Sequence, residues 1–297
     1  MTNSKKGIIL AILAASLYAL NSPLSKLLLS SIPPTLMAGF LYVGAGVGMC
    51  IVALVKKWLG KSEREEKIEK SDLLYVVLMI VLDILAPIFL MLGLSMTTAE
   101  NASLLNNFEI VATAIIALAV FKESISPRLW TGIIFVVVSC GVLSFEDVSS
   151  LSFSYGSLFI LLACLCWGVE NNCTRRLSSK DPLQIVVLKG VFSGLGSLII
   201  GFTVGERVYS FLPVLGALGV GFVAYGLSIF FYVYAQRFVG AARTSAYYAV
   251  APFIGVLLSI AIFQKLPVYS FWIALVLMAI GAWLCSDDKP IFKRKEK

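Results

Sequence analysis

Apolar stretches of about 20 residues, the helix length needed to cross a bilayer, recur from one end of this sequence to the other. Only short polar breaks separate them. The chain is 59% hydrophobic and 14% charged, whereas soluble domains carry about 25% charged residues. A soluble core cannot bury this much apolar surface, so the sequence predicts a protein whose solvent is the bilayer.

The apolar runs predict an all-α, polytopic membrane protein. Isolated strands would leave backbone groups unpaired in lipid, and the runs lack the alternation of a barrel strand. No cleavage site follows the first run, so we expect it to remain a membrane helix and not to be removed as a signal peptide. The ten expected transmembrane helices are 7–29, 34–55, 72–95, 98–121, 126–145, 154–174, 183–203, 210–234, 241–263 and 267–285.

Basic residues are distributed unevenly between the two sides of these spans. Of the 24 Lys and Arg residues, 20 lie in alternate loops and at the two chain ends. The other side has only Arg207 and Lys265, while Lys26 and Lys189 fall inside spans. Because basic loops stay in the cytoplasm, we expect a multi-pass protein of the cytoplasmic (inner or plasma) membrane with both termini cytoplasmic. The net charge of +7 therefore belongs to loops and indicates no nucleic-acid partner.

Several kinds of chemistry are missing from the sequence. It has no histidine, its six cysteines fall in apolar stretches without a CxxC pair, and it has no Walker motif. We therefore expect no metal, no cofactor and no enzymatic activity. A scaffold or receptor would need larger extramembrane parts than these loops provide, which leaves a carrier of a small-molecule substrate, surrounded by membrane lipid.

The second half of the sequence repeats the first. A shift of 149 residues aligns Tyr18 with Trp167 and Asn21 with Glu170, and a shift of 142 aligns the third to fifth spans with the eighth to tenth. We expect one transporter domain, 1–297, with repeats at 7–145 and 154–285. Five spans per repeat is an odd number, so the second repeat must be inverted in the membrane. Inverted repeats allow one site between them to open to either side in turn.

Two short motifs carry a resemblance to a known family. Ala-Ser-Leu-Leu-Asn-Asn-Phe-Glu at 102–109 leads to Phe-Lys-Glu-Ser-Ile-Ser-Pro-Arg-Leu-Trp-Thr-Gly at 121–132. The chain resembles the EamA-type carriers of the drug/metabolite transporter superfamily over nearly its whole length, which implies an alternating-access carrier with ten helices. The family commonly places Pro after that Glu. Pro252 keeps it in the second repeat, whereas Ile110 replaces it in the first, so we expect a kink in the ninth span.

Ionisable side chains inside spans are the main functional candidates. Each costs at least about 2.5 kcal/mol at a helix centre, so each needs a partner or a function. Asp83 lies near the middle of its span, and Glu109 lies nine residues beyond Glu100, about 13 Å deeper. We expect Glu170 and Lys189 to form an internal ion pair, which leaves Asp83 and Glu109 to attract cations. Lys26 is expected to reach the headgroups.

Polar and aromatic residues at aligned depths complete the expected site. Asn21 and Asn106 align with Glu170 and Tyr248, and Tyr225 aligns with Asp83. Aromatic faces beside carboxylates suit organic cations. The expected substrate-binding residues are Asp83, Glu109, Asn106, Tyr18, Asn21, Trp167, Glu170, Tyr225 and Tyr248.

Two substrate classes remain open. The favoured one is a cationic or zwitterionic amine or amino-acid-like metabolite, moved by exchange or with protons as the coupling ion through Asp83, Glu109 or Glu170. The alternative is an anionic, sugar-phosphate-like metabolite, for which Lys26, Lys189 or Arg175 would have to face the cavity. A monomer and a homodimer are both compatible with the sequence.

Overall fold

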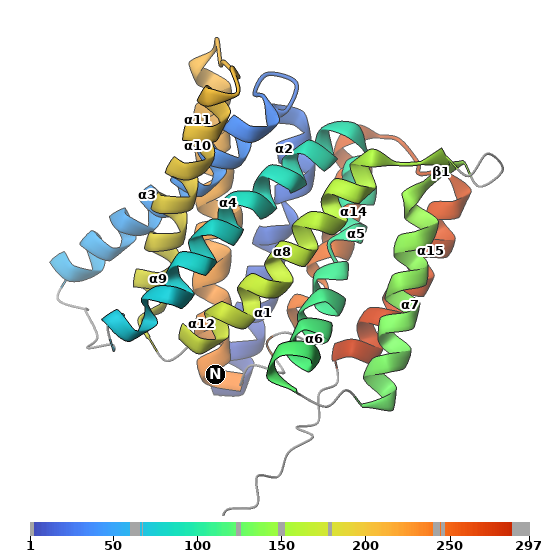
Figure 1. Ribbon diagram of the computed structural model, residues 1–297, viewed down its shortest axis with the longest axis horizontal. Coiled ribbons are helices and arrows are strands. Elements are labelled where there is room, and N and C mark those ends of the chain that lie inside the picture. The colour runs from blue at the N-terminus through green and yellow to red at the C-terminus, as the bar shows by residue number, and fades with distance from the viewer. Residues whose placement is uncertain are drawn as a thin grey trace, which may run out of the picture.

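The computed structural model describes residues 3–59, 66, 68–122, 126–147, 152–177, 180–239, 244 and 247–286, which form a bundle of tilted helices (Figure 1). The first repeat contains α1 (Asn3–Ala19), α2 (Asn21–Leu28), α3 (Pro34–Trp58), a short 3-10 turn η1 (Lys70–Asp72), α4 (Leu73–Met96), α5 (Ala99–Leu105), α6 (Phe108–Phe121) and α7 (Pro127–Ser144). The second contains α8 (Tyr155–Leu177), α9 (Pro182–Leu188), η2 (Lys189–Ser193), α10 (Gly194–Thr203), α11 (Phe211–Val220), η3 (Gly221–Leu227), α12 (Ser228–Val239), α14 (Ala251–Phe263) and α15 (Tyr269–Ser286).

The helices confirm the polytopic membrane architecture. Within the described chain, eight helical segments are long and apolar enough to cross a membrane: Lys5–Leu28, Pro34–Trp58, Lys70–Met96, Ala99–Val120, Pro127–Ser144, Tyr155–Thr174, Pro182–Thr203 and Phe211–Ala235. Two shorter apolar helices, Ala251–Phe263 and Tyr269–Cys285, occupy the last two expected spans. The start of the expected span 241–263, much of the loop after α3 and the basic C-terminal tail lie outside the described residues.

A small departure from pure helix joins the two repeats. β1 (Phe145–Asp147) pairs antiparallel with β2 (Ser152–Phe153). The pairing satisfies backbone groups of the extended residues, and the backbone N–H of Ser154 donates to the carbonyl of Ser144, the last residue of α7, at 2.8 Å.

Two helices, one in each repeat, end in the same way at equivalent positions. Helices α6 and α14 both stop at a left-handed residue, Lys122 with φ of 54° and Gln264 with φ of 51°. These positions are 142 residues apart, the same shift that aligns the spans. The structure therefore reproduces the internal repeat in its backbone as well as in its sequence.

The closest helix packing joins one repeat to the other. Helix α4 lies along α8, α1 along α12, α7 along α15, and α3 against α10 and η3 (Figure 1). Glycines permit the tightest approach, because a Cβ on Gly44 would lie 2.1 Å from the carbonyl oxygen of Leu218, and one on Gly221 would lie 1.9 Å from that of Leu41. The two halves are thus interlocked at backbone contact distance.

Several membrane spans are interrupted near their middles. The first breaks between α1 and α2, and the fourth breaks at Asn106 and Asn107 although Ile110 has replaced the family's proline. The ninth is interrupted just before Pro252, as expected. In the seventh and eighth, η2 and η3 are π-helical, a form that is rare and often found at functional sites.

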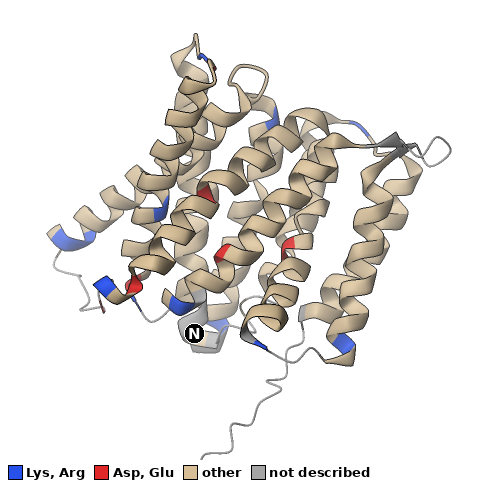
Figure 2. Ribbon diagram, in the orientation of Figure 1, with Lys and Arg blue, Asp and Glu red and all other residues tan. Residues whose placement is uncertain are grey.

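The ribbon segments of Lys and Arg are concentrated toward one end of the bundle, and segments of acidic residues lie partway along the helices (Figure 2). We call this the lysine-rich end; α3 and α6 finish there, at Lys56, Lys57 and Lys122. At the opposite end, the carboxylate of Glu206 accepts hydrogen bonds from the backbone N–H groups of Thr35 and Leu36 at the start of α3.

Candidate functional site

Three charged side chains meet inside the bundle, and we call them the charge cluster: Asp83 on α4, Glu170 on α8 and Lys189 at the start of η2. The Lys189 Nζ atom lies 3.1 Å from Asp83 Oδ2 and 2.8 Å from Glu170 Oε1. All three are buried, with Asp83 fully inaccessible. Two carboxylates share one ammonium, so the cluster has a net charge of −1 when all three groups are ionised.

Two hydroxyl groups complete the coordination of the carboxylates. Tyr42 on α3 donates to Asp83 Oδ1 at 3.0 Å, and Thr174 donates to Glu170 Oε1. Hydrogen bonds to a charged group are each worth about 1.5–3 kcal/mol, so they offset part of the burial cost. The expected Glu170–Lys189 pair is confirmed. The expectation that Asp83 remains unpaired is wrong, because Lys189 lies between the two acids.

Backbone irregularities place the cluster. Pro87 lies inside α4, four residues after Asp83, and its missing N–H leaves the Asp83 carbonyl without its helical partner. Lys189 opens the π-helical turn, next to Gly190, whose Cβ would lie 2.3 Å from the backbone nitrogen of Gly46. The close approach of α3 to η2 brings Tyr42 and Lys189 to the same point on α4.

A neutral contact between the two repeats occupies the positions that are repeat-equivalent to Glu170 and Asp83. Asn21 at the start of α2 donates to the hydroxyl of Tyr225 on η3 at 2.9 Å, and Ser25 donates to the Asn21 side-chain oxygen at 3.1 Å. Asn21 aligns with Glu170, and Tyr225 aligns with Asp83. We call Asn21 and Tyr225 the neutral pair.

A tyrosine cluster connects the neutral pair to the charge cluster. The Tyr225 ring centroid lies 5.1 Å from that of Tyr42 and 5.9 Å from that of Tyr18, and Tyr18 lies 5.8 Å from Tyr248. These are ordinary distances for interacting aromatic rings. Trp167, also expected at the site, is buried beside the Tyr42 hydroxyl. The four aromatic residues expected from the sequence therefore do converge.

Glu109, on α6, lies apart from the charge cluster and has polar partners of its own. Its Oε1 atom accepts a hydrogen bond of 2.7 Å from Asn171 on α8, and the same amide lies 3.2 Å from Thr113 Oγ1. Glu109 is half-buried. None of the ion pairs between described residues includes Glu109.

Asn106 lies at the break between α5 and α6, beside a small recess of about 10 Å³. Tyr18, Ser103 and Pro252 also line this recess. The buried oxygens Asn106 Oδ1 and Ser103 Oγ have no hydrogen-bond partner among the described residues. Such groups are costly to bury alone, and the recess beside them has room for about one water-sized donor.

Lys26 makes contacts that the sequence did not predict. Its Nζ atom lies 2.6 Å from the carbonyl oxygens of Leu94 and Thr97 and 3.3 Å from that of Ser95. These carbonyls lie at the end of α4, where helical partners are missing. Lys26 therefore caps a neighbouring helix, and its ammonium does not extend freely to the headgroups.

Sequence reasoning missed Tyr42, Thr174 and Asn171 as partners of the three acids. Each of the three is visible in the sequence as a polar side chain within an apolar span, but the sequence does not show which carboxylate it faces. Pro87 was visible four residues after Asp83. No comparable feature of the sequence predicts the π-helical turns η2 and η3.

Comparison with known proteins agrees with this architecture. The model of the EamA-like transporter family matches residues 5–145 and 154–286. An uncharacterized transporter of Methanothermobacter thermautotrophicus is 26% identical over 277 residues, covering 87% of this chain and 80% of that protein. The uncharacterized transporter YyaM of Bacillus subtilis is 24% identical over 275 residues, covering 89% and 88%.

A solved crystal structure shares the fold, with a TM-score of 0.65, 16% sequence identity and coverage of 95% of this chain and 94% of the other. At that identity the likeness concerns the fold alone. The family match spans both halves of the sequence, and the helices have the composition of membrane spans. The chain is a multi-pass membrane protein that belongs to the EamA-like transporter family.

Proposed function

We propose that this protein is a secondary carrier that moves a small cationic or zwitterionic amine, such as an amino-acid-like metabolite, by alternating access. Protons, or a second amine, travel in exchange. The chain acts as one transport domain over residues 1–297, and its two repeats, 7–145 and 154–285, rock about the site between them. No catalysis or cofactor is involved.

The charge cluster is the observation that carries this proposal. Asp83 belongs to the first repeat, whereas Glu170 and Lys189 belong to the second, so the cluster bridges the two halves. A relative movement of the halves changes the distances within the cluster. Its net charge of −1 in a buried setting is expensive, and uptake of one cation or one proton neutralises it. Cation binding and movement of the repeats are thereby coupled.

Features around the cluster favour an amine over an anion. An ammonium group has only donors, and Asn106 Oδ1 and Ser103 Oγ are buried acceptors without partners among the described residues. The neighbouring tyrosine rings offer π faces to a cation, at about 0.5–2 kcal/mol each. Two of the three basic residues that the anionic alternative requires are engaged, since Lys189 is shared by two carboxylates and Lys26 contacts carbonyls. The side chain of the third, Arg175, lies outside the described residues.

The lysine-rich end is proposed to face the cytoplasm, with both chain termini on that side of the cytoplasmic membrane. The bias of 20 basic residues against two supports this orientation. A reporter fused after Lys297 and a tag inserted at Lys61 should both be cytoplasmic, while a tag at Asp147 should be external. An external Lys61 tag would overturn the assignment.

The transport proposal is tested with purified protein in proteoliposomes. A thermal-shift screen of metabolites first selects ligands, and labelled ligands are then followed into vesicles with an imposed pH gradient. Primary or quaternary amines should compete for uptake, and sugar phosphates should have no effect. Competition by a phosphorylated metabolite together with failure of the amines would refute the cation site.

A further inference from the structure

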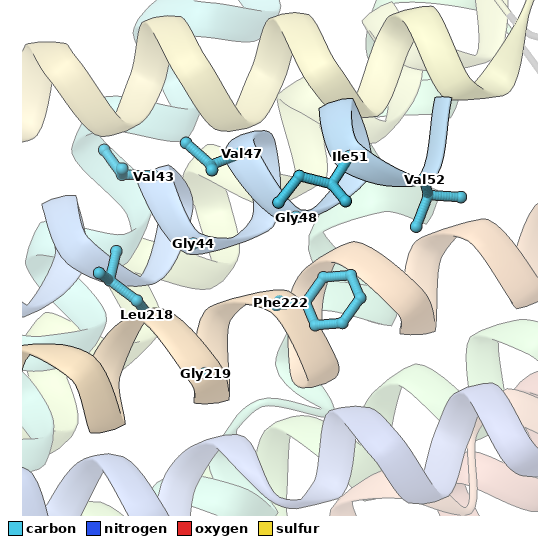
Figure 3. A pocket seen from close by; sticks show the side chains of 9 residues that line it. All are labelled: Val43, Gly44, Val47, Gly48, Ile51, Val52, Leu218, Gly219 and Phe222. Carbon is cyan, nitrogen blue, oxygen red and sulfur yellow. The ribbon is translucent and has the colours of Figure 1, made fainter. Parts of the chain in front are cut away.

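An apolar groove runs along the side of the bundle, between α3 and the helix formed by α11 and η3 (Figure 3). Its volume is about 370 Å³. Val43, Val47 and Val52 form one wall, and Leu218, Gly219 and Phe222 form the other. Both walls belong to membrane-spanning helices, and Val47 is 49% exposed. The groove therefore opens toward lipid.

The length of the groove matches one leaflet. Val43 and Val52 are nine residues apart on α3, which is about 14 Å at the rise of an α-helix. One leaflet contributes about half of the 30 Å hydrocarbon core. The groove thus has the depth of a single acyl chain that enters from one side of the membrane.

A pair of lysines stands just beyond one end of the groove. Lys56 follows Val52 by one turn of α3, and Lys57 is exposed next to it. The Lys56 ammonium lies 5.5 Å from the ring centre of Phe230 on the neighbouring α12, which holds it near the helix surface. Trp58 is 87% exposed, as expected for an aromatic anchor at headgroup level. Two positive charges at this level suit a phosphate headgroup.

We propose that this groove is a binding site for an anionic phospholipid of the leaflet at the lysine-rich end, with one acyl chain between α3 and η3 and the phosphate at Lys56 and Lys57. A second copy of the chain fits the same surface less well. Two copies inserted in the same direction and related by a two-fold axis would bring both lysine pairs to one interface, where they repel.

The groove shares a helical segment with the proposed transport site. Phe222, which lines the groove, and Tyr225 of the neutral pair belong to the same π-helical turn, η3. An acyl chain packed on Phe222 consequently supports the segment that presents Tyr225 to the site.

Native mass spectrometry of the purified full-length protein tests the proposal, with phosphatidylglycerol and phosphatidylcholine of identical acyl chains as probes. A Cβ on Gly219 meets no atom within 4 Å, so Gly219→Leu fills the groove without a backbone clash. Gly141 on α7 is equally open and lies outside the groove, which makes Gly141→Leu the matched control. Val47→Phe, at an exposed position, blocks the groove independently of any glycine.

The wild type and Gly141→Leu should retain phosphatidylglycerol in preference to phosphatidylcholine. Gly219→Leu and Val47→Phe should lose about tenfold in affinity for both lipids. Replacing Lys56 and Lys57 together by Gln should remove the preference and leave acyl binding, whereas Lys122→Gln should keep it. The proposal would be overturned if both Gly219→Leu and Val47→Phe retained the two lipids as well as the wild type does. The proposal would also be overturned if Val47→Cys formed a disulfide between two copies of the chain while its affinity for lipid stayed at the wild-type value.

Discussion

Glu170 and Asp83 occupy the same repeat positions as Asn21 and Tyr225, and each contact takes one residue from each repeat, yet the two contacts differ in charge. The first pair is joined through Lys189 at 2.8 and 3.1 Å, and the second by one neutral hydrogen bond of 2.9 Å. The repeat supplies the same scaffold twice. Only one of the two contacts consists of ionisable groups, so the protein has one charged contact and one neutral counterpart.

The energetic consequences of the two contacts are unequal. A neutral hydrogen bond contributes about 1 kcal/mol net, and its groups are cheap to bury when paired. Burying ions costs several kcal/mol each, and in the charge cluster one ammonium offsets that cost for both carboxylates. Loss of the ammonium should therefore destabilise the protein more than loss of either acid.

The largest effect is predicted for Lys189→Met. It leaves two buried carboxylates with no counter-charge and should lower the free energy of unfolding by about 3–5 kcal/mol, as found for broken buried ion pairs. Thermal denaturation in detergent measures this loss. The triple variant that adds Asp83→Asn and Glu170→Gln should recover most of it. A single variant as stable as the wild type would show that the cluster is not ionised.

A smaller effect is expected for Asp83→Asn, which leaves one acid to one ammonium. The protein should remain folded, because Tyr42 can still donate to the amide oxygen. Affinity for the amine should fall at least tenfold, since an interaction with a charged group is worth about 1.5–3 kcal/mol. Ligand titrations followed by thermal shift provide the measurement. Unchanged affinity would remove Asp83 from the site.

Glu109→Gln tests whether Glu109, the acid outside the charge cluster, carries the coupling proton. Its side-chain oxygen can still accept from Asn171, so stability should change by no more than about 0.5 kcal/mol. Transport assayed across a pH series should lose its pH dependence if Glu109 carries the coupling proton. A pH profile identical to that of the wild type would transfer that role to the charge cluster.

The smallest effect belongs to the neutral pair. Tyr225→Phe removes the hydroxyl that Asn21 donates to and keeps the ring against Tyr42, so stability should fall by about 1 kcal/mol. Amine affinity should change less than in Asp83→Asn. A larger loss of affinity than in Asp83→Asn would show that the amine depends more on the neutral pair than on the charge cluster.

Composition and periodicity were enough to predict the membrane helices, because the bilayer imposes one length and one secondary structure. The aligned shifts likewise predicted the repeat that Lys122 and Gln264 reproduce in the backbone. The partners of the buried acids were less accessible. Lys189 was assigned to Glu170 alone, since helix depth indicates which residues share a level but not which of two acids a lysine faces.

Uptake of a labelled amine into proteoliposomes bearing the reconstituted wild type or Asp83→Asn tests the central claim most directly. With an acidic lumen, the wild type should take up the amine while protons leave the lumen, and reversal of the pH gradient should reverse the net amine flux. Asp83→Asn should take up less than about a tenth as much at the same low amine concentration. A labelled sugar phosphate should be taken up by neither protein. Equal amine uptake by both proteins, or uptake of the sugar phosphate alone, would contradict a cation carrier built on the charge cluster.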